Sequence, residues 1–242
     1  MSGSFIAYFC HATPILVVVY MIYMLRQGLK ISSSRLRLKT PYVKSLLRYT
    51  SLGLMFWILL ISFLSYLNFF KDFNSFPPRI IFAFIPPIIL ITYLVRNRFF
   101  KLMLKSISEK SLIFFQTFRI VIELMFYLLY TISLVPFQMT FLGFNHDIMV
   151  GITALIAGNL FFFKRHRQQV AAILWNITGI IMLINIVTIT ALSSPFKYRV
   201  FMNDPSSEII ATFPYILIPG FIVPMAAGVH IFSIRQLILN GK

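Results

Sequence analysis

Charged residues are scarce in this sequence, and acidic residues are the scarcest of them. Asp, Glu, Lys and Arg make up 12% of the 242 residues, whereas a soluble domain typically carries about a quarter. Hydrophobic residues make up 59%, and the mean hydropathy is +0.85. A soluble fold cannot hide that much apolar surface from water. The composition therefore excludes a soluble globular protein and predicts a single transmembrane domain over residues 1–242.

Cysteine is nearly absent, and basic residues are absent from the start of the chain. Cys10 is the one cysteine, which excludes an intrachain disulfide. Residues Met1–Ser4 contain no Lys or Arg, whereas a cleavable signal peptide begins with a positively charged region. We therefore expect the first apolar segment to remain in the protein as a permanent helix.

The sequence also lacks the short motifs of many enzymes and cofactor proteins. It contains no G-x-S-x-G, no P-loop, no C-x-x-C-H haem motif and no H-E-x-x-H zinc motif. The last apolar segment contains no lysine, which excludes a retinal Schiff base there. We predict no metal and no cofactor, and the sequence assigns no catalytic residue. The four histidines are spread along the chain at His11, His146, His166 and His230.

Long apolar runs are what the sequence has instead. A helix needs about 20 apolar residues to cross the hydrocarbon core of a bilayer. The third and fifth runs have about 16 residues and would reach only ~24 Å as helices. The pattern predicts an all-α, polytopic seven-transmembrane-helix bundle, with helices at residues 5–25, 49–70, 80–95, 112–134, 148–163, 171–193 and 209–234.

The loops between these runs are strongly basic on alternate sides. The chain has 22 Lys and Arg against 6 Asp and Glu, and cytoplasmic loops are the ones enriched in Lys and Arg. This pattern predicts an inner (plasma) membrane protein with its N-terminus outside and its C-terminus in the cytoplasm. The residues that make the predicted cytoplasmic side basic are Arg26, Lys30, Arg35, Arg37, Lys39, Lys44, Arg48, Arg96, Arg98, Lys101, Lys105, Lys110, Lys164, Arg165, Arg167, Arg235 and Lys242.

The net charge of +16 does not indicate nucleic-acid binding, because the basic residues lie in short clusters between apolar runs. The most basic segment, residues 26–48, contains no acid. It is either an ordinary solvated loop or an amphipathic segment that binds anionic lipids of the inner leaflet. The bilayer itself is the one partner that the composition requires.

Two opposite charges lie inside the fourth apolar run. Arg119 and Glu123 are four residues apart and therefore share one helical face. A lone charge near the middle of a bilayer costs roughly 3 kcal/mol or more, so such residues indicate a functional site. They form either a ligand or proton site, or a buried ion pair that only fixes helix packing.

Other polar residues flank this pair. Asn145, His146 and Asp147 precede the fifth run and are predicted to form an outer rim, although Asp147 is also well placed to cap a helix. Asn185 is predicted at a depth similar to that of Glu123 and, with His230, is a weaker candidate to line the same cavity. The alternative for Asn185 is a hydrogen bond between helices.

The seventh run contains regularly spaced prolines. Pro214, Pro219 and Pro224 each remove a backbone donor and free a carbonyl upstream. A freed carbonyl needs a partner or a wet cavity in the membrane, so the run is predicted to be kinked or broken, as transporter helices often are. Pro86 and Pro87 predict a second break in the third run, and simple kinks are the alternative for both runs.

Several segments of the second half share a pattern with known sequences. They are Phe118–Glu123, Phe144–Ile148 with Gly151, Trp175–Thr188, and the proline-containing run that ends at His230. From Phe118 onward the chain resembles a family of uncharacterised bacterial multi-pass inner-membrane proteins. The resemblance implies a bacterial inner membrane and carries no activity with it.

Three classes of function remain open at this point. The first is a protein that binds a small or lipidic ligand in a polar pocket around Arg119 and Glu123. The second is a proton-coupled transporter that uses Glu123 and the broken seventh helix. The third, an intramembrane lipid-modifying enzyme, is the weakest because the sequence contains no recognisable pair of nucleophile and base.

Overall fold

The computed structural model describes residues 3–163 and 166–240. Three residues that contributed to the predicted cytoplasmic charge, Lys164, Arg165 and Lys242, lie outside this range. The described chain is mostly helical, with a two-residue antiparallel ladder between β1 (Phe162–Phe163) and β2 (His166–Arg167). The predicted all-α fold is therefore confirmed.

The structure divides the chain into helices joined mostly by short connections. The α-helices are α1 (Gly3–Arg35), α2 (Thr40–Tyr66), α3 (Ile81–Arg96), α4 (Arg98–Lys105), α5 (Glu109–Phe114), α6 (Arg119–Thr131), α7 (Ile148–Leu160), α8 (Gln169–Ser193) and α9 (Val223–Asn240). The 3-10 turns are η1 (Phe69–Lys71), η2 (Phe115–Phe118), η3 (Phe137–Met139) and η4 (Glu208–Ala211), and η5 (Ile218–Ile222) is a π-helix.

Several of these helices are long and apolar enough to span a membrane. Among the described residues, five stretches meet that test, and α3 with α4, bent by 79°, makes a sixth if the pair is one span. Helix α7 has 13 residues and is only ~20 Å long, which is less than a bilayer requires. The five stretches are Ser4–Arg35, Thr40–Tyr66, Glu109–Thr131, Gln169–Ser193 and Ile218–Asn240.

The predicted loop at residues 26–48 is mostly helical. Helix α1 continues to Arg35 and α2 begins at Thr40, so only a short linker separates them. Pro41 stands in the first turn of α2, where a missing N–H costs no hydrogen bond. Both helices thus extend beyond their apolar segments, because a basic, polar sequence remains compatible with helix where it leaves the apolar environment.

The predicted start of the last helix was also wrong. Residues 212–216 form a bend and turns, and the continuous helix begins with the π-helical segment η5. Two prolines, Pro214 and Pro219, remove the backbone donors that an α-helix would need in this stretch. The last helix is therefore continuous from Ile218 to Asn240 and irregular at its start, where η5 is a π-helix.

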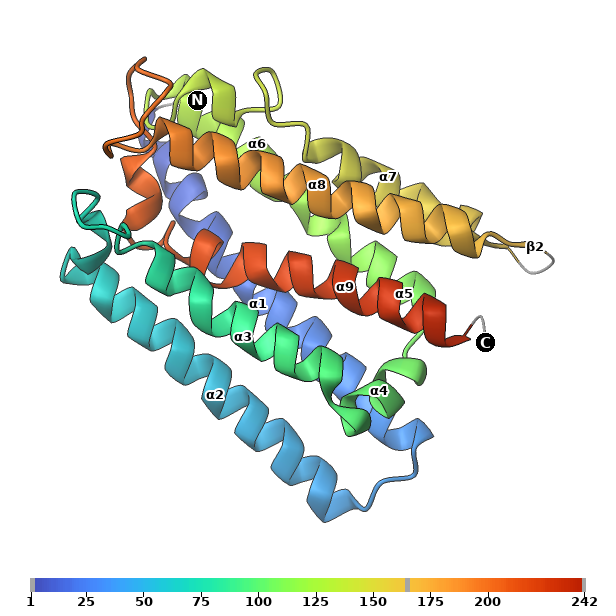
Figure 1. The fold of residues 1–242 in the computed structure, drawn as a ribbon. Helices are drawn as coiled ribbons and strands as arrows, with labels where there is room; N and C mark the ends of the chain where they lie inside the picture. Colours follow the sequence, from blue (N-terminus) through green and yellow to red (C-terminus); the bar gives the residue numbers. More distant parts are fainter. Residues whose placement is uncertain (1–2, 164–165, 241–242) are drawn as a thin grey trace.

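The helices run back and forth between two ends of an elongated bundle (Figure 1). The start of α1 and the connections after α2, α6 and α8 lie at one end. The α1–α2 linker, the α4–α5 connection, strands β1 and β2, and the end of α9 lie at the other end. This is the arrangement that alternating basic loops require.

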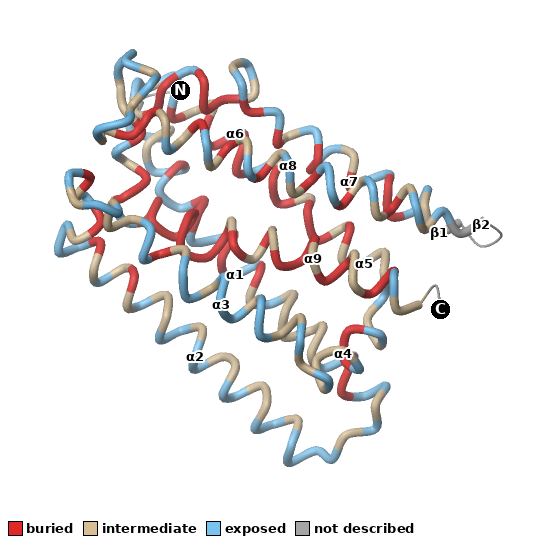
Figure 2. Tube along the Cα trace, in the orientation of Figure 1, coloured by how far each residue is buried: buried red, intermediate tan, exposed pale blue. Residues whose placement is uncertain are grey.

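Helix α9 occupies the centre and packs against α3, α4, α5 and α8, while α1 packs against α6. Buried residues concentrate on α9 and its neighbours, whereas α2 lies at the edge (Figure 2). Only 6% of the apolar window of α2 is buried. Its outward face carries large exposed apolar side chains: Tyr49, Leu52, Met55, Phe56, Leu59, Phe63 and Tyr66.

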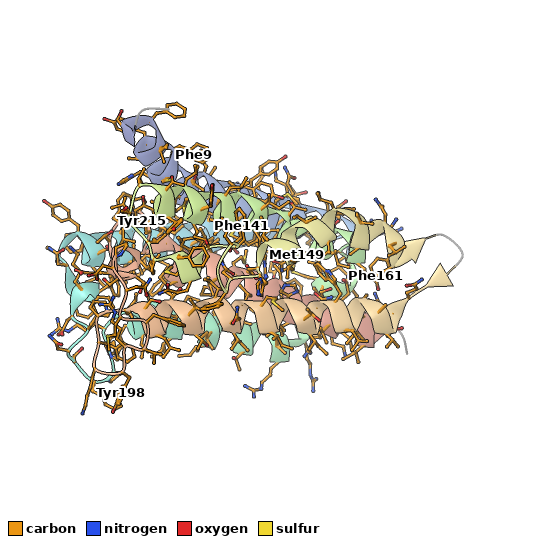
Figure 3. All side chains as sticks on the ribbon, turned by 90° about the horizontal axis from the view of Figure 1, so that it is seen from above. Phe9, Phe141, Met149, Phe161, Tyr198 and Tyr215 are labelled. Atoms are coloured by element: carbon orange, nitrogen blue, oxygen red, sulfur yellow. The ribbon has the colours of Figure 1, made fainter. Side chains whose placement is uncertain are left out.

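Large apolar side chains are exposed on other helices too, as on α8 at Leu174, Ile177, Ile181 and Ile184. Phe9 and Tyr198 project from the edges of the bundle, and side chains point outward around it (Figure 3). Exposed apolar patches of this extent are rare on monomeric soluble proteins and mark a surface that contacts lipid or another protein.

Candidate functional site

The interior is organised around Arg119, the first residue of α6. Its side chain is buried, yet it carries a charge. Nε donates to Oε1 of Gln116 at 3.1 Å, Nη1 donates to Asp147 and to the carbonyl of Gly179 at 3.4 Å, and Nη2 lies 2.9 Å from Nε2 of His230. One side chain therefore joins η2, the start of α7, α8 and α9.

This polar cluster lies about halfway along the bundle. Arg119 stands between Glu109, where α5 begins, and Thr131, where α6 ends. At the helical rise per residue, those ends are ~15 Å and ~18 Å away. The cluster is thus about midway between the two ends of this helical stretch.

The ion-pair partner of Arg119 is not the one that its sequence neighbourhood suggested. Among the described residues the guanidinium pairs with Asp147, and both side chains are buried. Asp147 does occupy the N-cap position of α7, but its side chain makes no capping hydrogen bond there and pairs with Arg119 instead. Physically, a lone buried charge costs roughly 3 kcal/mol or more, whereas an empty helix cap costs about 1 kcal/mol.

Asp147 reaches this depth because the chain turns back into the bundle after α6. Residues 132–147 descend to the level of Arg119 before α7 begins, which explains why α7 is short. Irregular backbone is tolerated at such depth where protein buries it. Of the three residues predicted as an outer rim, Asn145 and Asp147 are buried in the cluster and His146 is exposed.

Glu123 lies one helical turn after Arg119 and is also buried. Its Oε2 accepts a hydrogen bond from Nδ2 of Asn145 at 2.5 Å, and that amide also donates to the Met139 carbonyl at 3.0 Å. Asn145 Oδ1 in turn accepts from the backbone N–H of Asp147 at 3.1 Å. The second oxygen of Glu123, Oε1, has no hydrogen-bond donor among the described residues.

His230 joins the cluster on the side of α9 through Arg119, but it is not among the residues that line the adjoining cavity. A guanidinium only donates, so Nε2 of His230 must accept from Arg119. Nδ1 then carries the proton and donates to Oδ1 of Asn176 at 2.9 Å. The amide of Asn176 donates to the Ser233 hydroxyl at 3.1 Å. These partners fix the ring as a neutral imidazole of defined tautomer.

A close approach between α8 and α9 makes this contact possible. A Cβ atom built on Gly179 would overlap the imidazole of His230. Glycine at this position therefore leaves room for the ring and exposes the carbonyl that faces Arg119.

Asn185 does not join the cluster. Its side chain is partly exposed and donates to the Phe144 carbonyl at 2.8 Å. It therefore fastens the segment that carries Asn145, which agrees with the alternative of a hydrogen bond between segments.

Sequence reasoning missed two members of the site, Gln116 and Gly179. Gln116 is three residues before Arg119 on the same helical face, and its Nε2 also donates to the Ala226 carbonyl at 3.0 Å. Gly179 is three residues after Asn176 and therefore shares its face. Both spacings were readable from the sequence, but neither residue carries a charge that would have drawn attention.

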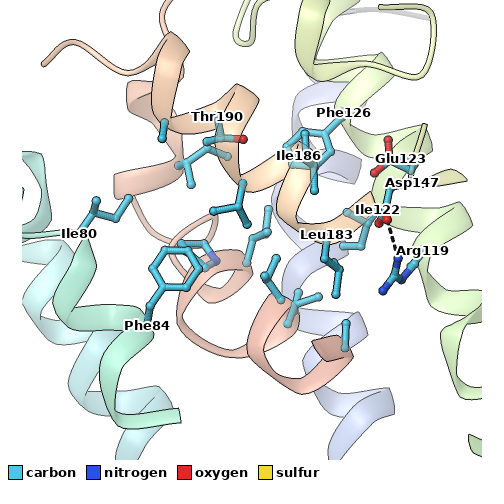
Figure 4. Close-up of a pocket in the computed structure, with 18 of the residues that line it drawn as sticks. Ile80, Phe84, Arg119, Ile122, Glu123, Phe126, Asp147, Leu183, Ile186 and Thr190 are labelled. Atoms are coloured by element: carbon cyan, nitrogen blue, oxygen red, sulfur yellow. Dashed lines mark hydrogen bonds and ion pairs between the residues drawn. The ribbon is translucent and has the colours of Figure 1, made fainter. Parts of the chain in front are cut away.

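A cavity of about 380 Å³ adjoins the cluster. Figure 4 shows Arg119, Glu123 and Asp147 at one end, and Ile80, just before α3, and Phe84 of α3 at the other. The walls between are mostly apolar and come from α6, α8, η5 and the start of α9. Its rim includes exposed residues on both sides: Ile81 and Ile88 of α3 and Ala191 of α8.

The charges that face this cavity do not balance. The cluster contains one guanidinium and two carboxyl groups, and His230 is held neutral by its partners. With Asp147 paired to Arg119, an ionised Glu123 would be uncompensated in an apolar interior, which is costly. A proton or a cationic group at Glu123 removes that cost.

Among the described residues, no group of three His, Cys, Asp or Glu side chains could hold a metal ion.

Comparison with known proteins gives one match. No curated protein and no solved structure matches the chain. The model of a domain of unknown function, DUF8737, matches residues 75–238, about two thirds of the chain. The matched region begins earlier than the resemblance from Phe118 onward and includes Gln116, Arg119, Glu123, Asp147 and His230. The chain therefore belongs to the DUF8737 family, an uncharacterised family as its sequence pattern indicated.

Proposed function

We propose that the protein crosses the inner (plasma) membrane of a bacterium seven times and binds an amphipathic, lipid-like ligand in the cavity beside Arg119 and Glu123. In this proposal the N-terminus is outside and the C-terminus is in the cytoplasm. The basic connections at one end of the bundle support this orientation. The apolar outer faces of α2 and α8 support contact with lipid.

One observation carries the ligand proposal. A buried carboxylate, Glu123, lines an apolar cavity, and its Oε1 has no donor among the described residues. Polar groups inside proteins are almost always hydrogen-bonded, so a carboxylate oxygen that lacks a protein donor beside a cavity is suited to accept a hydrogen bond from a bound molecule. The cavity volume of about 380 Å³ lies within the usual range of small-molecule pockets.

The shape and chemistry of the cavity indicate the class of ligand. The apolar walls suit a hydrocarbon chain, and the exposed rim between α3 and α8 lets such a chain enter sideways from the bilayer. Glu123 suits a head group that donates a hydrogen bond, such as a hydroxyl or an amine. A cationic amine would also balance the charge of the cluster.

Native mass spectrometry of the full-length protein, purified in a mild detergent, tests this proposal. We expect the wild-type protein to retain a lipid-like mass adduct. Glu123→Gln should lose most of it. The substitution replaces one carboxylate oxygen with an NH2 group and removes the charge, while it keeps the size of the side chain. Glu208→Gln is the matched control, since Glu208 is exposed and does not line the cavity.

Two results would overturn the proposal. The first is a wild-type protein without any adduct that also fails to bind long-chain alcohols or amines added during purification. The second is a Glu123→Gln variant that retains the adduct as well as the wild type does. Size-exclusion chromatography of each variant separates loss of ligand from loss of fold.

A proton-coupled transporter is the second candidate, and the irregular start of α9 favours it. A hydrogen-bonded chain runs from Glu123 through Asn145, Asp147 and Arg119 to His230. Arginine keeps its protons in proteins, so this chain cannot pass a proton beyond Arg119. Transport therefore requires access to Glu123 through the cavity, and proteoliposomes with an internal pH dye would detect flux that Glu123→Gln abolishes.

A further inference from the structure

A second cavity lies between α1 and α2, separate from the polar cluster. Its volume is about 430 Å³. The cavity is lined by three basic side chains, one serine and two leucines: Arg26, Lys44, Leu47, Arg48, Ser51 and Leu52. Three positive charges from two helices thus converge on one hollow.

The charges in this hollow have no acidic partner. Nη1 of Arg26 donates to the Ser51 hydroxyl at 2.5 Å, which directs the guanidinium across the space between the helices. Among the described residues, none of Arg26, Lys44 and Arg48 forms an ion pair. Three positive charges held close together repel one another. An anion bound between them attracts all three and so offsets that repulsion.

The position of the hollow along the helices is informative. Arg26 directly follows the apolar segment 5–25 of α1, and Arg48 directly precedes the apolar segment of α2 that begins at Tyr49. Both residues therefore stand where apolar sequence ends, which is the level of the phosphate groups when the helices cross a bilayer. Leu47 and Leu52 flank the charges and offer apolar contact to acyl chains.

We propose that this cavity binds the phosphate of an anionic phospholipid in the cytoplasmic leaflet, with Arg26, Lys44 and Arg48 as its ligands. This inference rests on the orientation proposed above and does not depend on the cavity beside Glu123. It narrows the anionic-lipid interpretation of residues 26–48 from a whole segment to three side chains around one hollow. Basic pockets between membrane helices are suited to such head groups.

Lipid titration of the full-length protein in a neutral detergent tests this site. The probes are phosphatidylglycerol and phosphatidylcholine with identical acyl chains, and bound lipids are counted by native mass spectrometry. We expect tighter binding of phosphatidylglycerol and a loss of about fivefold in its affinity for each cation removed. The test variant carries Arg26→Gln, Lys44→Gln and Arg48→Gln together.

The matched control carries Arg98→Gln, Lys101→Gln and Lys105→Gln in α4, which gives the same net charge and leaves the hollow intact. We expect this control to bind phosphatidylglycerol nearly as the wild type does.

Equal losses in both triple variants would mean diffuse attraction to a basic surface and would overturn the site. Displacement of the lipid by millimolar inorganic phosphate would identify a soluble anion as the ligand instead. Glu123→Gln should leave this binding unchanged, so failure of one proposal is distinguishable from failure of the other.

Discussion

At the scale of single residues, the geometry of Arg119 determines what the interior can tolerate. A guanidinium has five N–H donors in one plane and no acceptor, so burying it requires several oxygen or nitrogen acceptors arranged around that plane. Gln116, Asp147, Gly179 and His230 supply them from separate elements. The cluster is therefore a cross-link between elements as well as a candidate site.

Removing the charge of Arg119 should destabilise the protein strongly. Arg119→Gln leaves Asp147 buried without its partner, and breaking such a pair costs about 3–5 kcal/mol. For a chain of this size, that corresponds to a fall of roughly 6–20 °C in the apparent melting temperature. The double variant Arg119→Gln with Asp147→Asn should recover part of the loss, as measured by intrinsic fluorescence during heating in detergent.

The exposed ion pair of Arg79 with Asp72 provides the comparison for this experiment. It has an N–O distance of 2.9 Å, but both side chains are partly solvent-exposed. Arg79→Gln should therefore lower stability by less than about 1 kcal/mol. If the losses from Arg119→Gln and Asp147→Asn simply add in the double variant, the two residues are not a coupled pair.

The sequence identified most of the charged residues of the site but not their pairing. Arg119 and Glu123 stood out because they are charged and lie in an apolar run, and His230 was expected beside them. The i,i+4 spacing favoured Glu123 as the partner of Arg119. Asp147 is 28 positions away in sequence, and no local spacing rule reports that separation. The pairing depends on how residues 132–147 descend into the bundle, which is a tertiary property.

At the scale of elements, the irregular start of the last helix shows how the bundle compensates for proline. Pro224 has no N–H, so the Gly220 carbonyl lacks its usual donor four residues later. The indole N–H of Trp57 on α2 donates to that carbonyl at 2.8 Å. Ser65, two turns further along α2, donates to the Ala211 carbonyl at 2.8 Å. Helix α2 therefore stabilises this break with its few inward-facing polar groups.

Replacing Trp57 tests that role. Trp57→Phe removes the donor while keeping an aromatic ring, and hydrogen bonds between membrane helices contribute about 0.6 kcal/mol and up to about 1.7 kcal/mol. In a Pro224→Ala background, the new backbone N–H can serve Gly220, so the same substitution should cost less. The measurement is the monodisperse fraction that survives heating, followed by size-exclusion chromatography.

The second tryptophan offers a matched control for this cycle. Trp175 donates to the Thr153 hydroxyl at 3.0 Å, far from Pro224 in sequence. Trp175→Phe should cost the same with and without Pro224→Ala. An identical loss from Trp57→Phe in both backgrounds would show that the indole acts through packing and not through the carbonyl.

Element boundaries were the least predictable part of the fold. Apolar runs located the helices, but they underestimated α1 and α2, because hydropathy reports the surrounding medium and not where helical hydrogen bonding ends. They overestimated the fifth helix, which ends at Leu160 and not at Phe163, and the seventh, which begins at Ile218 and not at Ile209. Residues 132–147 and 208–216 include many buried residues without forming regular α-helix, and side chains satisfy part of their backbone: Asn145 donates to the Met139 carbonyl and Ser65 to the Ala211 carbonyl.

At the scale of the whole molecule, the proposed topology can be tested by labelling single cysteines, because Cys10 is the chain's one cysteine and Cys10→Ala gives a cysteine-free background. Single cysteines at Ser34, Asn74, Ser108 and Met202 would all be exposed near the ends of the bundle. A membrane-impermeant maleimide added to intact cells should label positions 74 and 202 only, while all four should react in inverted or permeabilised membranes.

The bent α3–α4 pair makes this outcome informative, because a re-entrant α3 would put positions 74 and 108 on the same side and shift every later loop. Labelling of position 108 from outside would therefore remove the proposed orientation of α6, α8 and α9, and with it the assignment of the rim between α3 and α8 to the bilayer.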